Sequence, residues 1–276
     1  MKKIISMVLV LVMICSFSAV AFAEGKQTLV FGTSADYAPF EFMYPDETGK
    51  MVYGGIDVLV AQYIADYLDM ELQIENMDFG YLLTALNKGD FDMVLADIEP
   101  TEKRQKAADF SDGYYQELPE MFLIRAEDVE KFNDAAVDFN GKTVGAQAGS
   151  TKIEKAEEKC VGATVVSLPL IPDLVNELVN KKIDAILLDG SVAVSYDKSN
   201  PDLSVATGLE GVFEIANPIA VAVAKGDPKG LLPGINEAIA KLLEENKVEE
   251  FIAIVDQIQG IEEVSAEAPE GYEADE

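Results

Sequence analysis

The sequence predicts an α/β fold, in which the strands of a mainly parallel sheet alternate with helices. Between residues 28 and 96, three short apolar runs are separated by two segments whose apolar residues recur at helical spacing. The resulting order, β-α-β-α-β, is the pattern that right-handed crossovers in a parallel sheet produce. With 276 residues, half of them apolar, the chain suits one large or two small globular units.

The elements of the first half follow from these patterns. We predict strands over residues 28–33, 72–74 and 93–96, and a helix that follows Phe79 and contains three leucines. The helix after residue 55 is amphipathic. Its predicted core face carries Ile56, Val60, Tyr63, Ile64, Tyr67 and Leu68, and its predicted polar face carries Asp57, Gln62, Asp66 and Asp69.

The second half repeats the alternation, and two amphipathic helices close it. The predicted strands cover residues 120–125, 164–166, 182–189 and 217–225. The predicted helices start at Pro172, run from 227 to 243, and run from 248 to about 257. Asp184 stands at the start of its strand, where we expect it to cap the strand or face solvent.

The first 23 residues have the three parts of a secretory signal peptide. Lys2 and Lys3 form a positive start, residues 4–14 form an apolar run, and residues 21–23 form a small-x-small cleavage site. A retained anchor is the alternative. Cys15 lacks the small preceding residue of a lipoprotein signal, so ordinary cleavage at Ala23 and export are expected.

Charge and cysteine content restrict the partners of the mature chain. Without residues 1–23, 19 basic residues face 50 acidic ones, a net charge of −31. This charge excludes nucleic acid and anionic lipid as favoured partners, and it favours a soluble monomer. Only Cys160 remains, so no intrachain disulfide is possible. Residues 261–276 contain seven acidic residues and are predicted to form a disordered acidic tail.

A candidate anion site follows the strand over residues 93–96. Pro100 and Thr101 suit the first turn of a helix, and Arg104 lies one turn further on. Ligands of open α/β sheets bind at the carboxyl ends of the strands. A guanidinium beside free helix N–H groups binds carboxylates well. The alternative is that Arg104 is an ordinary surface residue.

Two blocks resemble a known family. The stretch from Thr101 to Arg104, followed by Asp109-Phe110-Ser111-Asp112-Gly113-Tyr114-Tyr115, resembles the T-x-E-R…x-F-S-x-x-Y-Y signature of the extracellular solute-binding proteins of family 3. Residues 138–151 resemble that family's D-L-x-G-K-x-V-G-V-x-x-G-[ST] block, with Phe139 in place of Leu. The resemblance covers residues 28–257 and implies the two-lobed periplasmic-binding-protein fold (type II) with two crossover strands as hinge.

This resemblance also implies domain boundaries and the groups that bind a ligand. Lobe 1 would comprise residues 24–118 and 213–260, and lobe 2 residues 119–212. The ligand is a free amino acid in this family. The resemblance assigns its α-carboxylate to Arg104 and to the helix start at Gly149, Ser150 and Thr151, and its α-ammonium to Asp189. A plain helix cap is the alternative for Ser150 and Thr151.

Three further positions are implied at the side-chain end of the ligand. Tyr37 and Phe79 match two aromatic positions that enclose the ligand stem, although Tyr37 could equally pack inside its own loop. Ser34 stands where relatives selective for cationic amino acids carry Asp. Ser34 therefore leaves the side-chain specificity open.

Asp97 and Glu99 replace the Gly, Ser or Thr usual in the family. Carboxylates at i and i+2 of an extended segment project to one face. One hypothesis is that one of them meets a cationic ligand side chain, which would make the ligand a basic amino acid. The alternative is that both face solvent or pair with Lys103 or another cation.

The function implied is capture of an amino acid for an ABC importer, with lobe closure and docking of the closed form on membrane permease subunits. An enzyme such as a periplasmic cyclohexadienyl or arogenate dehydratase is the alternative on the same fold, and a sensory input domain is a third. The sequence has no His, no phosphate loop and no metal-ligand cluster. We therefore expect no catalytic residues, no metal and no cofactor.

Overall fold

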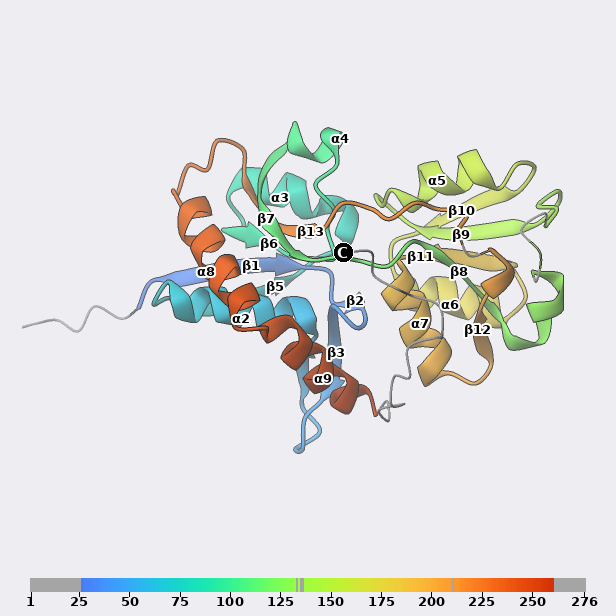
Figure 1. Ribbon diagram of the computed structural model, residues 1–276, viewed down its shortest axis with the longest axis horizontal. Coiled ribbons are helices and arrows are strands. Elements are labelled where there is room, and N and C mark those ends of the chain that lie inside the picture. The colour runs from blue at the N-terminus through green and yellow to red at the C-terminus, as the bar shows by residue number, and fades with distance from the viewer. Residues whose placement is uncertain (1–25, 133, 135–136, 210, 261–276) are drawn as a thin grey trace, which may run out of the picture.

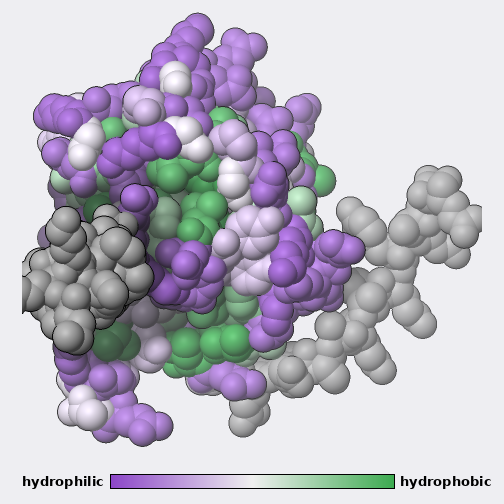
Figure 2. Space-filling model, turned by 90° about the vertical axis from the view of Figure 1, so that its left-hand side faces the viewer, coloured by the Kyte–Doolittle hydropathy of each residue, from purple (hydrophilic) through white to green (hydrophobic). Residues whose placement is uncertain are grey.

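The computed structural model describes residues 26–260, apart from 133, 135–136 and 210. The predicted signal peptide (1–23) and acidic tail (261–276) lie outside the described residues. Within that described part, no helix is long and apolar enough to cross a membrane. Viewed from the side of the first lobe, the surface is mostly hydrophilic, with smaller hydrophobic areas between (Figure 2).

The first lobe is built on a five-stranded sheet with strand order β5-β1-β6-β13-β7. β1 pairs in parallel with both β5 and β6, whereas β13 runs antiparallel to β6 and β7. The strands are β1 (Thr28–Thr33), β5 (Glu71–Asn76), β6 (Met93–Val94), β7 (Ala108–Tyr115) and β13 (Ile219–Ala224). The helices of this lobe are α2 (Ile56–Tyr67), α3 (Leu82–Lys88), α4 (Glu102–Gln105), α8 (Leu232–Glu244) and α9 (Lys247–Gln259).

The second lobe repeats this plan with strand order β10-β9-β11-β8-β12. Here β8 is the one strand that runs against its neighbours. The strands are β8 (Met121–Arg125), β9 (Thr143–Gln147), β10 (Thr164–Leu168), β11 (Ala185–Leu188) and β12 (Leu203–Val205). The helices are α5 (Lys152–Lys159), α6 (Ile171–Val179) and α7 (Gly190–Ser199). Short 3-10 helices are η1 (Phe79–Tyr81), η2 (Ala126–Lys131) and η3 (Thr207–Leu209).

The chain crosses between the two sheets twice. It leaves the first sheet after β7 and enters the second at β8, and it returns between β12 and β13 (Figure 1). The predicted two-lobed α/β fold with mainly parallel sheets is therefore confirmed. The carboxyl ends of β6, β9 and β11 lead directly into Asp97, Gly149 and Asp189.

Three predictions about local structure were wrong. Tyr67 was expected on the core face of its helix, but it is 41% exposed. The segment after β1 was expected to be a loop, but it forms a small antiparallel sheet of β2 (Asp36–Tyr37), β3 (Glu41–Pro45) and β4 (Met51–Gly54). Asp57 was expected on the polar face of its helix, but its side chain is fully buried. Asp57 tolerates burial because two hydrogen-bond donors from distant segments satisfy its carboxylate.

Cys160 is buried at the end of α5, and burial raises the pKa of its thiol to about 11. Asp184 is partly exposed, as expected, and its carboxylate accepts a hydrogen bond from the Thr143 N–H at the start of β9, at 2.7 Å. Asp184 therefore contributes to the second lobe's internal bonding.

Candidate functional site

A cavity of about 280 Å³ lies between the lobes. From the first lobe it is lined by Phe79, Thr101 and Arg104, and from the second by Gly149, Ser150 and Thr151. Five of the ten residues proposed from the sequence therefore surround one space. The cavity therefore brings together residues of the two lobes, such as Thr101 and Gly149, that are about fifty positions apart in the chain.

Arg104 is held in place on three sides. The Thr101 side chain caps α4 by accepting a hydrogen bond from the Arg104 N–H at 3.2 Å. The guanidinium donates to the Glu99 carbonyl at 3.1 Å and stands over the Phe79 ring, 5.2 Å from its centroid. Burial lowers the pKa of Arg104, but guanidinium groups remain charged in proteins. Phe79 thus orients the cation, in addition to lining the cavity.

The helix start opposite Arg104 comes very close to the first lobe. Gly149 has a φ of +81°, and a Cβ atom at this position would lie 2.6 Å from the Gly80 Cα. The Ser150 hydroxyl donates to the Gln147 carbonyl at 2.7 Å, which leaves its lone pairs as acceptors. Only glycine satisfies both the backbone conformation and the close approach of the lobes.

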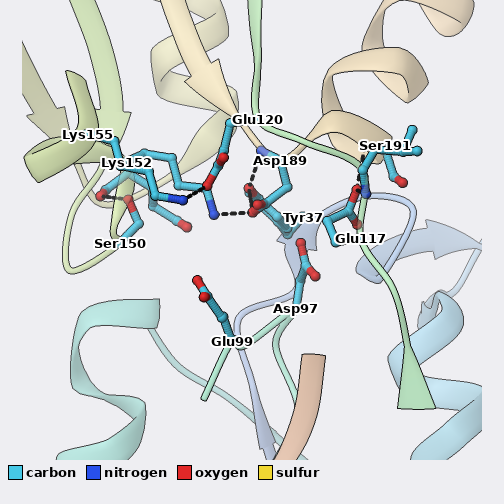
Figure 3. Close-up of polar contacts among 12 residues, drawn as sticks. Tyr37, Asp97, Glu99, Glu117, Glu120, Ser150, Lys152, Lys155, Asp189 and Ser191 are labelled. Atoms are coloured by element: carbon cyan, nitrogen blue, oxygen red, sulfur yellow. Dashed lines mark hydrogen bonds and ion pairs between the residues drawn. The ribbon is translucent and has the colours of Figure 1, made fainter. Parts of the chain in front are cut away.

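Asp189 lies deeper between the lobes and already has two partners. Its carboxylate accepts a hydrogen bond from the Tyr37 hydroxyl at 2.7 Å and forms an ion pair with the buried ammonium of Lys152 (Figure 3). Burial alone would raise the pKa of Asp189, but Lys152 and Tyr37 lower it. Because Tyr37 belongs to the first lobe, its bond to Asp189 connects the two lobes. The sequence interpretation did not identify Lys152.

Asp97 is held through its backbone, while its carboxylate has no partner. Its φ is +44°, and its N–H donates to Asp57 at 2.8 Å, whose other oxygen accepts from the Tyr114 hydroxyl at 2.7 Å. The Asp97 side chain is 6% exposed, and neither carboxylate oxygen has a hydrogen-bond partner in the described part of the chain. Burial, with the neighbouring Asp189 and Glu117 carboxylates, raises the pKa of Asp97 well above its usual range.

Glu99 and Ser34 make other contacts. The Glu99 carboxylate accepts a hydrogen bond from the Asn217 side chain at 3.1 Å, on the segment that returns to the first lobe. The Ser34 hydroxyl donates to Asp36 at 3.0 Å, and Asp36 accepts from the Ile171 N–H of the second lobe at 2.8 Å. Neither residue lines the cavity at Arg104. The carbonyl of Glu99 nevertheless orients the Arg104 guanidinium.

Glu117 is a second buried carboxylate that the sequence interpretation missed. It lies in the first crossing between the lobes and is 2% exposed. One oxygen accepts hydrogen bonds from the Leu118 N–H at 2.7 Å and the Ser191 N–H at 2.8 Å. Burial, followed by the charge of Asp189, raises the pKa of Glu117 to about 7. Glu117 stands shortly before the predicted strand over residues 120–125, and its local sequence gave no signal of a site.

Lys152, in contrast, had a sequence signal. It occupies the first position of α5, where the helix dipole favours acidic residues over basic ones. A lysine there requires compensation, which Asp189 provides. The site thus has two parts: the cavity at Arg104, and a buried group of Tyr37, Asp97, Glu117, Lys152 and Asp189 beside it.

The raised pKa values predict how stability depends on pH. Asp57 has a pKa of about 6 and Glu117 of about 7, so both bind a proton more tightly in the folded than in the unfolded chain. Their stabilising contribution is complete below about pH 4 and is lost as pH rises through 6 and 7. We expect thermal denaturation without ligand to give a higher Tm at pH 5 than at pH 8.

The raised pKa of Glu117 alone corresponds to a loss of about 3 kcal/mol in the free energy of unfolding between low pH, where Glu117 is protonated, and high pH, where it is ionised. Glu117→Gln should flatten the upper part of the pH profile because the amide does not titrate. A Tm that increases from pH 5 to pH 8 would contradict this account of the buried carboxyl groups.

Comparison with known proteins identifies the class to which this fold and site belong. The model of the bacterial extracellular solute-binding proteins, family 3, matches residues 29–253. The chain belongs to this family, as the motifs around Arg104 and Gly149 predicted.

Individual relatives cover most of the chain. The arginine-binding extracellular protein ArtP of Bacillus subtilis (strain 168) is 36% identical over 191 residues, which cover 68% of this chain and 71% of that protein. An amino acid ABC transporter substrate-binding protein from Streptococcus pneumoniae, bound to L-arginine, superposes with a TM-score of 0.77 at 35% identity, covering 84% and 94% of the two chains. The ancestral amino acid-binding protein AncCDT-1, a precursor of cyclohexadienyl dehydratase, superposes with a TM-score of 0.73 at 26% identity, covering 82% and 94%.

Proposed function

We propose that this protein is the receptor of an amino-acid ABC importer and captures a free amino acid between its lobes. The observation that carries the proposal is a fixed cation and a fixed anion beside one interlobe space. Arg104 of the first lobe would bind the α-carboxylate, together with the helix start at Ser150 and Thr151. Asp189 of the second lobe would bind the α-ammonium. Since each lobe supplies one charge, the ligand itself holds the lobes together.

The energetics of binding a zwitterion support this assignment. Each charge of an amino acid is strongly hydrated, and burying it without a partner costs several kcal/mol. Arg104 is oriented before binding by Thr101, Glu99 and Phe79, so little ordering is required when the carboxylate arrives. A micromolar Kd corresponds to a binding free energy of about −8 kcal/mol, which two charge-assisted contacts and the burial of apolar surface can supply.

Arginine is the first ligand to test. The Bacillus relative is described as arginine-binding, and the pneumococcal structure contains L-arginine. Beside the cavity, the buried carboxylates of Asp97 and Glu117 lack full hydrogen bonding, which suits a positively charged ligand. The mature protein would be exported and would dock on the membrane permease in its closed, ligand-bound form.

Isothermal titration calorimetry with the purified mature protein tests the proposal. We expect a Kd in the micromolar range for at least one of arginine, lysine, histidine, glutamine, glutamate and cystine. The same preparation should not convert prephenate or arogenate. If none of the twenty amino acids or cystine binds below millimolar concentration, the receptor proposal is wrong.

A further inference from the structure

Three carboxylates gather between the lobes near the buried ammonium of Lys152. Asp97 comes from the end of β6, Glu117 from the first crossing, and Asp189 from the end of β11, and their side chains lie close together (Figure 3). All three are at least nine-tenths buried. Among the described residues, Lys152 forms an ion pair with Asp189 alone. The group therefore has more negative than positive charge in a region that water reaches poorly.

Glu117 is positioned with one oxygen left available. The N–H groups of Leu118 and Ser191 fix Oε1, and the Ser191 N–H belongs to the first turn of α7. Oε2 is buried and has no hydrogen-bond partner among the described residues, and the same is true of both oxygens of Asp97. Leaving such acceptors without a donor costs free energy, so they favour a donor supplied by a ligand.

We propose that Glu117, together with Asp97, is a specificity-determining cation subsite that selects amino acids carrying a second positive charge. This inference rests on the proposed receptor function and deepens it. The α-ammonium of a neutral amino acid brings only one positive charge to the three carboxylates. A ligand with a cationic side chain brings two, and the second one favours the ionised forms of Asp97 and Glu117 beside Asp189.

The discriminating chemistry is the charge of the ligand, not its size. Citrulline has nearly the shape of arginine, but a neutral ureido group replaces the guanidinium. The Glu117 subsite would accept several N–H donors from either group, but only the guanidinium compensates the buried negative charge. The preference for arginine over citrulline therefore measures this subsite separately from the α-carboxylate and α-ammonium contacts that both ligands share.

The experiment compares the Kd values of arginine and citrulline by calorimetry at pH 8, where Glu117 is ionised. For the unmodified protein we expect arginine to bind on the order of a hundredfold more tightly. Glu117→Gln keeps an acceptor for the Leu118 and Ser191 N–H groups, and it should reduce this ratio to below about tenfold by weakening arginine binding while leaving citrulline nearly unchanged. Asp97→Asn should also lower the arginine-to-citrulline ratio. This variant tests the proposal even if Glu117→Gln does not fold.

Glu120→Gln is the matched control. Glu120 is nearly as buried as Glu117, lies in the same crossing and also has an Oε2 without a hydrogen-bond partner among the described residues, but its Oε1 forms an ion pair with Lys155, so its charge is already compensated. The arginine-to-citrulline ratio of this variant should remain that of the unmodified protein.

Three outcomes overturn the proposal: equal binding of arginine and citrulline by the unmodified protein, an unchanged ratio in both Glu117→Gln and Asp97→Asn, or an equal loss of both ligands in these variants. An equal loss of both ligands would mean that Glu117 and Asp97 have a structural role at the hinge. If no amino acid binds the unmodified protein, the receptor function itself fails, which is a different result.

Discussion

Arg104→Ala is expected to raise the Kd for the amino-acid ligand about a thousandfold, which corresponds to about 4 kcal/mol. The first lobe contributes two cations to the cavity lining, the exposed Lys103 and the more buried Arg104, and the alanine variant at Arg104 leaves the ligand carboxylate without the buried one. Few internal contacts are lost, because within the described part of the chain the side chain makes a single hydrogen bond, to the Glu99 carbonyl, and one ring contact with Phe79. The Tm without ligand should therefore change by only a few degrees.

Calorimetry and thermal-shift titration of the variant measure both quantities. Lys103→Ala is a suitable control, since Lys103 is the neighbouring cation and forms an exposed ion pair with Glu154 across the lobes. That pair should contribute less than about 1 kcal/mol. Arg104→Lys keeps the charge but loses the planar fork, so its affinity should fall between those of Arg104→Ala and the unmodified protein. Unchanged binding by Arg104→Ala would refute the carboxylate assignment.

Gly149→Ala is expected to weaken ligand binding on the order of a hundredfold by keeping the lobes apart, since misplacing binding groups by about 1 Å has effects of this size. The added Cβ would lie 2.6 Å from the Gly80 Cα, and backbone on both sides leaves little room for adjustment. Small-angle X-ray scattering should show a smaller ligand-induced decrease in radius of gyration than the unmodified protein shows.

Gly141→Ala separates this contact from backbone strain. Gly141 also has a positive φ, +72°, but a Cβ there would meet nothing within 4 Å. Both variants should lose about 1 kcal/mol of stability, because alanine is strained at positive φ. Only Gly149→Ala should lose affinity. Equal affinities in the two variants would show that the close approach to Gly80 does not control closure.

The sequence predicted those features that local patterns determine. Hydrophobic periodicity located α2 within one residue and β1 at both ends, because these elements bury a regular face. Family motifs selected Arg104 and Gly149, which the structure places on opposite sides of one cavity. These motifs carry the information because a carboxylate-binding fork and a glycine turn require particular residues at fixed spacing.

Features that depend on distant contacts could not be predicted in this way. Asp57 looked like a solvent-facing residue, but its partners Asp97 and Tyr114 lie 40 and 57 positions further along the chain. Glu117 is unremarkable in its local sequence, and Lys152 is marked only by its position at a helix start. Both become part of the site because the crossing and α5 adjoin Asp189. A single sequence contains no measure of that proximity.

The main chain and the side chain of residue 97 differ in their contacts, and this difference affects how the ligand specificity can change. The main chain at this position donates a hydrogen bond to Asp57, whereas the Asp97 carboxylate has no hydrogen-bond partner among the described residues. Replacement by asparagine or glycine, which tolerate this backbone conformation, would leave the supporting scaffold intact. Single substitutions at residue 97 can therefore change the ligand preference without preventing the chain from folding.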